Sequence, residues 1–152
     1  MKDTYLKAMR LFFLLVLISG IGSVGSGFMT DDTMLWYHYL NKSALTPPNI
    51  VFPIVWGILY VLLAVSAFLV WGKTSPRVFV FALACILAWP FSFFYFRAVG
   101  FSILVILLLI ALLAICFKKF HPLNRWAAYL LIPVLAWCVF ALYLNIFIWL
   151  NN

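Results

Sequence analysis

The sequence predicts an all-α membrane protein in which a single domain, residues 1–152, forms a bundle of five transmembrane helices. Of its 152 residues, 68% are hydrophobic and 9% are charged, against about 45–50% and about 25% in soluble domains. The charged residues leave five long uncharged runs, each long enough for a helix that crosses the hydrocarbon core of a bilayer. The stretch Leu104–Leu113 is apolar throughout, whereas the strands of a transmembrane barrel alternate polar and apolar residues.

The charges set the expected limits of each helix, near residues 8–28, 50–71, 77–96, 99–118 and 126–150. Going along the chain, these helices are separated by Lys42, by Lys73 and Arg77, by Arg97, and by Lys118, Lys119 and Arg125. The first helix has a competing interpretation. Lys2, Lys7 and Arg10, followed by Leu11–Ile18 and the small residues of 19–27, also fit a secretory signal with a cleavage site. The four-residue spacing of these small residues favours a retained helix that packs closely.

The basic residues also predict the orientation. Lys2, Lys7, Arg10, Lys73, Arg77, Lys118, Lys119 and Arg125 fall on one side of the membrane, and only Lys42 and Arg97 on the other. The positive-inside rule then places the amino terminus in the cytoplasm and the carboxyl terminus outside. The long loop expected at about 29–49 faces outward, and we interpret it as a lid.

Several function classes are disfavoured. The net charge of +7 comes from sparse residues and forms no basic patch for nucleic acid. No ionisable residue lies well inside a predicted helix, which argues against proton-coupled transport. The three acids, Asp3, Asp31 and Asp32, all lie outside the hydrocarbon, so no catalytic carboxylate pair is expected. His38 and His121 fall on opposite sides, and we expect no metal site. Cys85, Cys116 and Cys138 lie on three helices and are expected to pack as small hydrophobic residues.

Aromatic residues make up 20% of the chain, with seven Trp, seven Tyr and sixteen Phe. An interfacial belt accounts for Trp71, Trp126 and Trp149. Phe52, Trp56 and Tyr60 form a stripe on the second helix, and Trp137, Ala141 and Asn145 form another on the fifth. The topology places Phe52, Trp56, Trp89, Phe93, Phe101, Leu104, Ala141 and Asn145 in the outer half of four helices, with Trp137 nearer mid-membrane. Such convergence predicts a wide apolar pocket for a flat hydrophobic ligand. Ordinary core packing is the alternative.

Three blocks of residues then resemble a known family. The run Trp36-Tyr37, Leu40, Lys42, Pro47-Pro48, Val51, Val55-Trp56 and Leu59-Tyr60 is similar to the signature of the translocator protein or tryptophan-rich sensory protein family. Ala88-Trp89-Pro90 with Phe93-Phe94, Arg97 and Gly100 is similar to its third helix. Leu135-Ala136-Trp137, Phe140-Ala141, Leu144-Asn145, Ile148-Trp149 and Asn151 resemble its fifth helix.

The resemblance implies a five-helix protein, often a homodimer, that binds tetrapyrroles such as protoporphyrin or haem, sterols in some members, and synthetic aromatic ligands. It implies no obligatory cofactor. The implied pocket residues, with Asn145 added from its stripe, are Trp36 in the covering loop, Phe52, Val55, Trp56, Trp89, Phe101, Leu104, Leu108, Trp137, Ala141, Leu144 and Asn145. The spacing of Ala84 and Ala88 is suited to a dimer face on the third helix, although ordinary packing within the bundle explains it too.

The chain departs from the family at three positions. Ile86 stands where Asn is common, Val105 where Asp is common, and Val134 where Tyr is usual. Affinity for ligands that use these polar anchors should fall, whereas an apolar pocket still suits a porphyrin ring. The sterol pattern at the carboxyl terminus is also missing, since no basic residue follows Arg125.

Two functions remain open. In the first, the protein is a sensor, carrier or regulator, and Lys42 or Arg97 pairs with the propionates of the bound ring; the alternative is that Arg97 snorkels and Lys42 is solvated. In the second, it is an enzyme of light-dependent porphyrin breakdown that uses the indoles of Trp36, Trp56 and Trp137. The charge pattern fits a bacterial inner membrane, and the resemblance leaves a mitochondrial outer membrane open.

Overall fold

The computed structural model describes residues 2–152, with side chains from Thr4 onward, so the side chains of Lys2 and Asp3 lie outside the described ones. Within this part the chain is helical and contains no strand. The helices are α1 (Lys2–Ser26), α2 (Asp31–Tyr39), α3 (Val51–Leu69), α4 (Arg77–Pro90), η1 (Phe91–Tyr95), α5 (Val99–Phe120), α6 (Arg125–Tyr129) and α7 (Leu131–Asn151). Five spans are long and apolar enough to cross a bilayer, which confirms the predicted all-α membrane fold.

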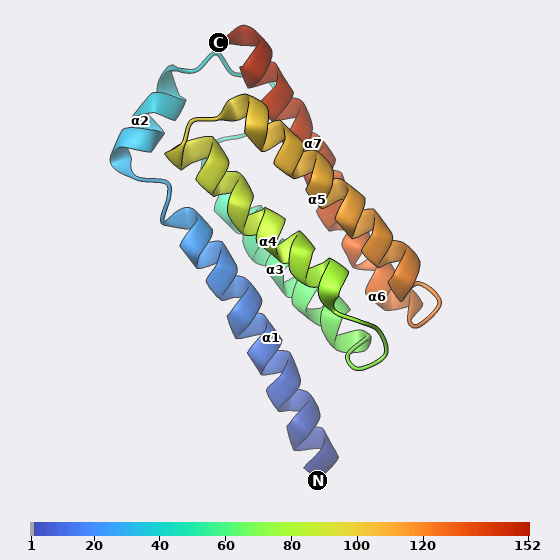
Figure 1. Ribbon diagram of the computed structural model, residues 1–152. Coiled ribbons are helices and arrows are strands. Elements are labelled where there is room, and N and C mark those ends of the chain that lie inside the picture. Colours follow the sequence, from blue (N-terminus) through green and yellow to red (C-terminus); the bar gives the residue numbers. More distant parts are fainter. Residues whose placement is uncertain (1) are drawn as a thin grey trace.

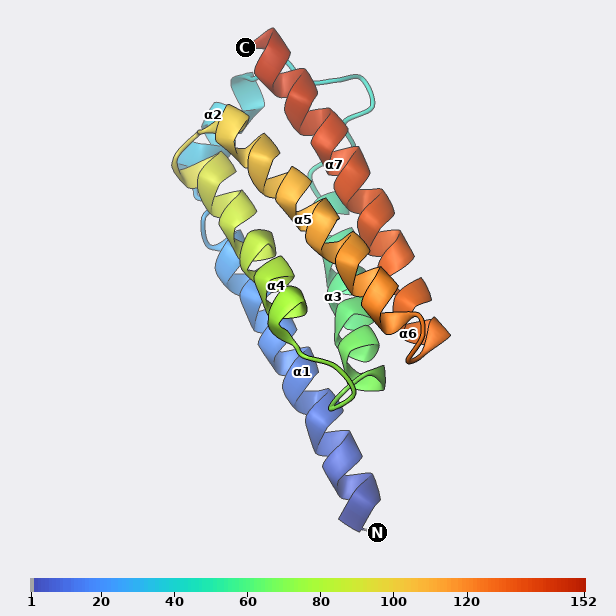
Figure 2. The same ribbon diagram turned by 45° about the vertical axis from the view of Figure 1, so that its right-hand side comes forward.

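The five spans pack side by side (Figures 1 and 2). The largest contacts join α1 to α3, α4 to α5, and α5 to α7, with α1 also packed on α4. The contact between α3 and α7 is much smaller than those three. Helix α3 also contacts α6, so its contact with the last span is divided between α6 and α7.

The third predicted helix, 77–96, is not uniform, because α4 ends at Pro90 and continues as the π-helix η1. Proline has no N–H to give to the carbonyl four residues earlier, which breaks the α-helical ladder. The wider turn that follows bonds Phe96 N to Phe91 O at 3.2 Å. Short π segments of this kind often lie at functional sites, and this one carries the buried Phe93 and Phe94.

The predicted helix at 126–150 is likewise divided, at Leu130, into α6 and α7. Asn124 caps α6, since its side-chain oxygen accepts from Trp126 N at 3.0 Å and Ala127 N at 3.2 Å. Pro133, in the first turn of α7, cannot donate to the carbonyl of Tyr129. The missing bond explains why the α-helix is interrupted shortly before this proline.

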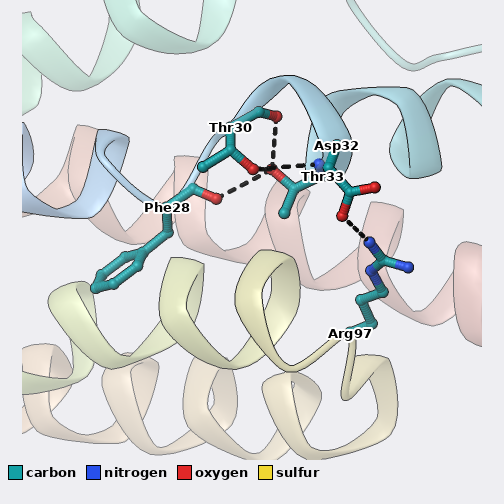
Figure 3. A network of polar contacts seen from close by, with 5 residues as sticks. All are labelled: Phe28, Thr30, Asp32, Thr33 and Arg97. Carbon is teal, nitrogen blue, oxygen red and sulfur yellow. Dashed lines mark hydrogen bonds and ion pairs between the residues drawn. The ribbon is translucent and has the colours of Figure 1, made fainter.

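The segment predicted as a loop at about 29–49 contains helix α2. Thr30 is its N-cap, and Thr33 Oγ1 donates to the carbonyls of Phe28 at 3.0 Å and Thr30 at 2.9 Å (Figure 3). Asp31 and Asp32 lie in the first turn, where negative side chains interact favourably with the helix dipole and stabilise the helix. The loop expectation was wrong here because a cap and two first-turn acids suffice to start a short helix.

Candidate functional site

A small cavity lies between α3, α4, α5 and α7. Its free volume is about 20 Å³, the space of a single water molecule. Its lining is apolar and mostly aromatic: Phe52, Trp56, Ile86, Trp89, Ile106, Leu109, Trp137, Cys138 and Ala141. The structure thus brings together five of the residues that the sequence placed in the pocket, namely Phe52, Trp56, Trp89, Trp137 and Ala141.

Aromatic contacts fix the walls of the cavity. The rings of Phe52 and Trp137 meet edge to face across α3 and α7, with centroids 5.9 Å apart. Trp56 stacks on Tyr60 at 5.4 Å, one turn along α3, and Trp89 stacks on Phe93 at 5.5 Å across the junction with η1. Ring packing therefore holds the lining residues in place. Their side chains fill almost all of the space that the sequence predicted as a wide pocket.

A second hollow, an open groove of about 560 Å³, runs along the seam between α3 and α7. Its lining residues are Val55, Ile58, Leu59, Leu62, Pro133, Ala136, Trp137 and Phe140. Val55, another predicted pocket residue, therefore lies in the groove. Trp137 lines both hollows.

Helix α5 presents a different face from the one expected. Phe101 and Leu104 are each 60% exposed and Leu108 is 54% exposed, so their side chains point away from the bundle. Ile106 and Leu109 line the cavity in their place. The buried face of α5 also carries the small polar residues Ser102 and Cys116, and polar side chains in membrane helices face the bundle interior. That signal is present in the sequence and identifies the inward face.

Leu144 and Asn145 are buried on α7, outside the cavity. Asn145 is 2% exposed, and its amide donates to Val99 O at 3.1 Å and to Ser102 Oγ at 2.7 Å. These bonds tie α7 to the start of α5. The structure gives Asn145 a packing role that its place on the aromatic stripe did not reveal.

Trp36 lies on α2, one ring away from the cavity. Its indole meets Phe93 edge to face at 5.6 Å, and Phe93 stacks on Trp89. Buried Tyr37 contacts Phe93 and Phe94. Helix α2 therefore packs over η1, next to the cavity, through aromatic contacts, and its role as a lid stays a prediction.

Arg97 holds this cover in place. It forms an ion pair with Asp32 (Figure 3), and its guanidinium lies 5.6 Å from the ring of Trp36. The backbone of Arg97 is left-handed, with φ of 52°, a conformation that costs a residue with a side chain about 1 kcal/mol or more. From this conformation the side chain reaches both Asp32 and Trp36 of α2.

Lys42 is engaged at the other end of α2. Its ammonium donates to the carbonyls of Tyr37 at 2.8 Å, His38 at 2.9 Å and Leu40 at 3.3 Å, and it lies 4.8 Å from the ring of Tyr37. Burial lowers the pKa of Lys42 and raises the pKa of the Tyr37 phenol. Both cations predicted to meet propionates thus already have partners within the protein.

The cavity contains no charged side chain, and two of its donors lack acceptors. Among the described side chains, Trp89 Nε1 and Trp137 Nε1 are the buried nitrogen or oxygen atoms that make no hydrogen bond. Of the three departures from the family pattern, Ile86 lines the cavity, whereas Val105 and Val134 are buried outside it. Among residues 4–152, no three His, Cys, Asp or Glu side chains lie close enough to hold a metal ion.

The fold and this cavity define a five-helix integral membrane protein with a tryptophan-walled site. The profile of the TspO/MBR family matches residues 12–150. The chain is 34% identical to the translocator protein of Homo sapiens over 138 residues, 85% of this chain and 82% of that protein. It is 31% identical over 133 residues to the tryptophan-rich protein TspO of Chlorobaculum tepidum, 82% of this chain and 84% of that protein.

A third relative spans nearly the full length of both proteins. The tryptophan-rich protein TspO of Archaeoglobus fulgidus is 28% identical over 155 residues, covering 97% of this chain and 99% of its own. The chain belongs to the TspO/MBR family, as the three motif blocks predicted.

Proposed function

We propose that the protein binds tetrapyrroles, such as protoporphyrin or haem, and sterol-like or other flat hydrophobic ligands, and acts as a sensor, carrier or regulator of porphyrin metabolism. The observation that carries this proposal is that Phe52, Trp56, Trp89 and Trp137 line one cavity. Aromatic faces on three helices suit a flat conjugated ring. The resemblance of the motif blocks to the family supports the same class of ligand.

Binding requires the cavity to enlarge, because sites for such ligands have volumes of about 300–1,000 Å³ and this one has about 20 Å³. Trp137 is the side chain whose movement joins the cavity to the groove of about 560 Å³. The weak contact between α3 and α7 favours opening at the same place. In this proposal the ligand enters from the bilayer through that seam.

The carboxylates of a porphyrin would compete with Asp32 for Arg97, since that guanidinium is reached from the cavity through Trp89, Phe93 and Trp36. Lys42 is a second partner for a carboxylate, at the expense of its bonds to the carbonyls of α2. These pairings orient the ring and contribute less to affinity than its stacking, because exposed ion pairs are weak.

The test is a titration of tryptophan fluorescence with protoporphyrin on the purified protein in detergent. We expect saturable quenching with one ring per chain, and a loss of affinity of about tenfold in Trp137→Phe, which removes much of the contact area. The matched control is Trp126→Phe, since Trp126 is 72% exposed and remote from the cavity lining. Equal affinities in wild type and both variants would place the ring elsewhere.

Illumination of the same complex separates binding from breakdown. A sensor or carrier bleaches its bound protoporphyrin no faster than detergent solution does. Faster loss of the porphyrin absorbance that depends on Trp56 would instead support the enzyme. Titrations with haem and cholesterol, read by the same fluorescence, rank the other ligand classes.

A homodimer through α4 is part of this proposal. Ala84 is exposed on α4 next to half-buried Ala88, and small residues four apart let two membrane helices approach closely. Cross-linking in membranes should give a dimer that Ala84→Phe weakens and Leu108→Phe, on the exposed face of α5, does not. Loss of the dimer in both variants, or in neither, would exclude this face.

A further inference from the structure

The open groove between α3 and α7 is lined by apolar residues along its whole length. Its walls extend from Val55 to Leu62 on α3 and from Pro133 to Phe140 on α7, which is about 10 Å along each helix. Pro133 and Ala136 are exposed, and their small side chains leave room beside α7. An unfilled hollow deprives its walls of packing contacts, so in a bilayer an apolar group has to occupy this one.

Each wall of the groove leads to an exposed cation at the end of the bundle that holds the amino terminus. Helix α3 ends at Leu69 and is followed by Lys73, whose ammonium donates to Leu69 O at 3.2 Å. Helix α7 is preceded by α6, which begins with Arg125. Figure 2 shows the α3–α4 connection and α6 at this same end. Neither cation forms an ion pair with a described acidic side chain.

A buried hydrogen bond sets how far the groove lies from this charged end. Ser66 Oγ donates to Ala127 O at 2.7 Å, which holds α6 against α3 one helical turn beyond Leu62. The exposed Trp126 on α6 is a residue type that favours headgroup depth. From Ser66 to Val55 the rise along α3 is about 16 Å, close to the hydrocarbon thickness of one leaflet, about 15 Å. The groove and this turn therefore reach from the headgroups to mid-membrane.

We propose that the groove between α3 and α7 binds one acyl chain of an anionic phospholipid whose headgroup pairs with Lys73 and Arg125. This occupant carries a hydrocarbon chain and a negative charge at the separation that the groove and the two cations require. A helix of another protein, about 10–12 Å across, is wider than a groove of this volume and length accepts. Cations at the membrane surface attract anionic lipids. The inference goes beyond the proposed function and does not depend on tetrapyrrole binding.

The first experiment compares phosphatidylglycerol with phosphatidylcholine of the same acyl chains, so that the two probes differ only in the headgroup. Native mass spectrometry of the purified protein in detergent follows the bound lipid as each is titrated. We expect one tightly bound phosphatidylglycerol, preferred about tenfold. Lys73→Gln with Arg125→Gln should reduce the preference to about twofold or less, since each cation contributes a severalfold attraction.

The matched control for charge is Lys7→Gln with Arg10→Gln. It removes two exposed cations from the same end of the molecule, but from α1, whose largest contacts are with α3 and α4. The preference for phosphatidylglycerol should stay near its wild-type value. An equal loss in both double variants would mean that general surface charge, and no site at the groove, selects the lipid.

The second experiment fills the groove. Ala136→Phe should weaken the binding of both lipids by about fivefold or more, because the added ring takes the place of the acyl chain. Ala111→Phe is the control, since Ala111 is exposed on α5 and is not part of the groove lining. In the wild type, phosphatidylglycerol with a diazirine on its acyl chain should cross-link mainly to residues 55–62 and 133–140. This readout requires no substitution.

Equal affinity for the two lipids, unchanged binding in Ala136→Phe, or cross-links spread evenly over the exposed faces of α1 and α5 would overturn the inference. The proposed function is tested separately. If phosphatidylglycerol binds in the groove and protoporphyrin does not quench the tryptophans, the lipid site stands and the tetrapyrrole site is wrong. If protoporphyrin shows Trp137-dependent binding and the two lipids bind alike, the reverse holds.

Discussion

Gly22 lies where α1 crosses the ring of Tyr60 on α3. A Cβ at this position would overlap the ring carbons of Tyr60, so only glycine allows the two helices to approach this closely. Tyr60 in turn stacks on Trp56, which lines the cavity. The lack of a side chain at Gly22 therefore helps to set the position of Trp56 in the cavity wall. Gly22 is also one of the small residues whose spacing favoured a packed first helix.

Gly22→Ala should destabilise the protein by about 1–3 kcal/mol relative to Gly20→Ala, the usual cost of an overpacked contact. The comparison is matched, because both glycines are inside α1 and gain the same helix propensity from alanine. A Cβ at Gly20 meets nothing within 4 Å. Unfolding in detergent, followed by tryptophan fluorescence, gives the difference. Equal stabilities would mean that α1 does not pack on Tyr60 at Gly22.

At the scale of elements, α2 is too short to be stable alone and depends on contacts at both ends. At its start, Thr33 N donates to Thr30 Oγ1 and Thr33 Oγ1 donates to Thr30 O (Figure 3). At its end, the ammonium of Lys42 donates to the carbonyls of Tyr37 and His38. The connection that follows is fastened to α7 by Asn41 N to Asn152 Oδ1 at 2.8 Å and by Ser43 to Tyr143 at 2.8 Å. Helix α2 is thus a cover tied at η1 and at α7.

Asp32→Asn should raise the affinity for protoporphyrin by about two- to fivefold, because it frees Arg97 from an exposed ion pair of modest strength. Protoporphyrin dimethyl ester, which has no carboxylates, should bind wild type and variant alike. Asp31→Asn is the control, since it removes the same charge from the same turn, and the ion pair of the described side chains is made by Asp32. An increase with the ester, or with both variants, would show that Arg97 does not meet the propionates.

At the scale of the whole molecule, the fold divides the charges between its two ends. The amino terminus, the α3–α4 connection and the α5–α6 connection lie at one end (Figure 1), and they carry Lys7, Arg10, Lys73, Arg77, Lys118, Lys119 and Arg125. The carboxyl terminus and α2 lie at the other end with Lys42 and Arg97. This distribution supports the proposed cytoplasmic amino terminus.

A membrane-impermeant maleimide should therefore label Asn152→Cys in intact bacterial cells and should label Lys118→Cys only after the membrane is opened. The native thiols give little background, since Cys85, Cys116 and Cys138 are all buried. Labelling is read by a mass shift on a gel. The opposite pattern would invert the proposed orientation, and labelling of both variants in intact cells would indicate mixed insertion.

Much of this protein follows from the sequence alone. Hydropathy and charge spacing determined the five spans, because an uncharged apolar run of this length has no other favourable place than a bilayer. The aromatic stripes and the resemblance to the family anticipated Phe52, Trp56, Trp89, Trp137 and Ala141 at the cavity. Helix ends were less predictable: α1 starts at Lys2 rather than near residue 8, since a charge ends a membrane span without ending a helix.

Only the tertiary structure decided how much room the aromatic rings leave, and hydropathy alone left open which face of α5 turns inward. On a helix that is apolar all round, periodicity does not distinguish lipid from neighbouring helices, so Phe101, Leu104 and Leu108 could not be separated from Ile106 and Leu109 by hydropathy. The cavity volume depends on how side chains from four helices pack together, and whether an indole N–H is unpaired depends on the groups that surround it. These are properties of contacts between distant residues, which no local pattern in the chain contains.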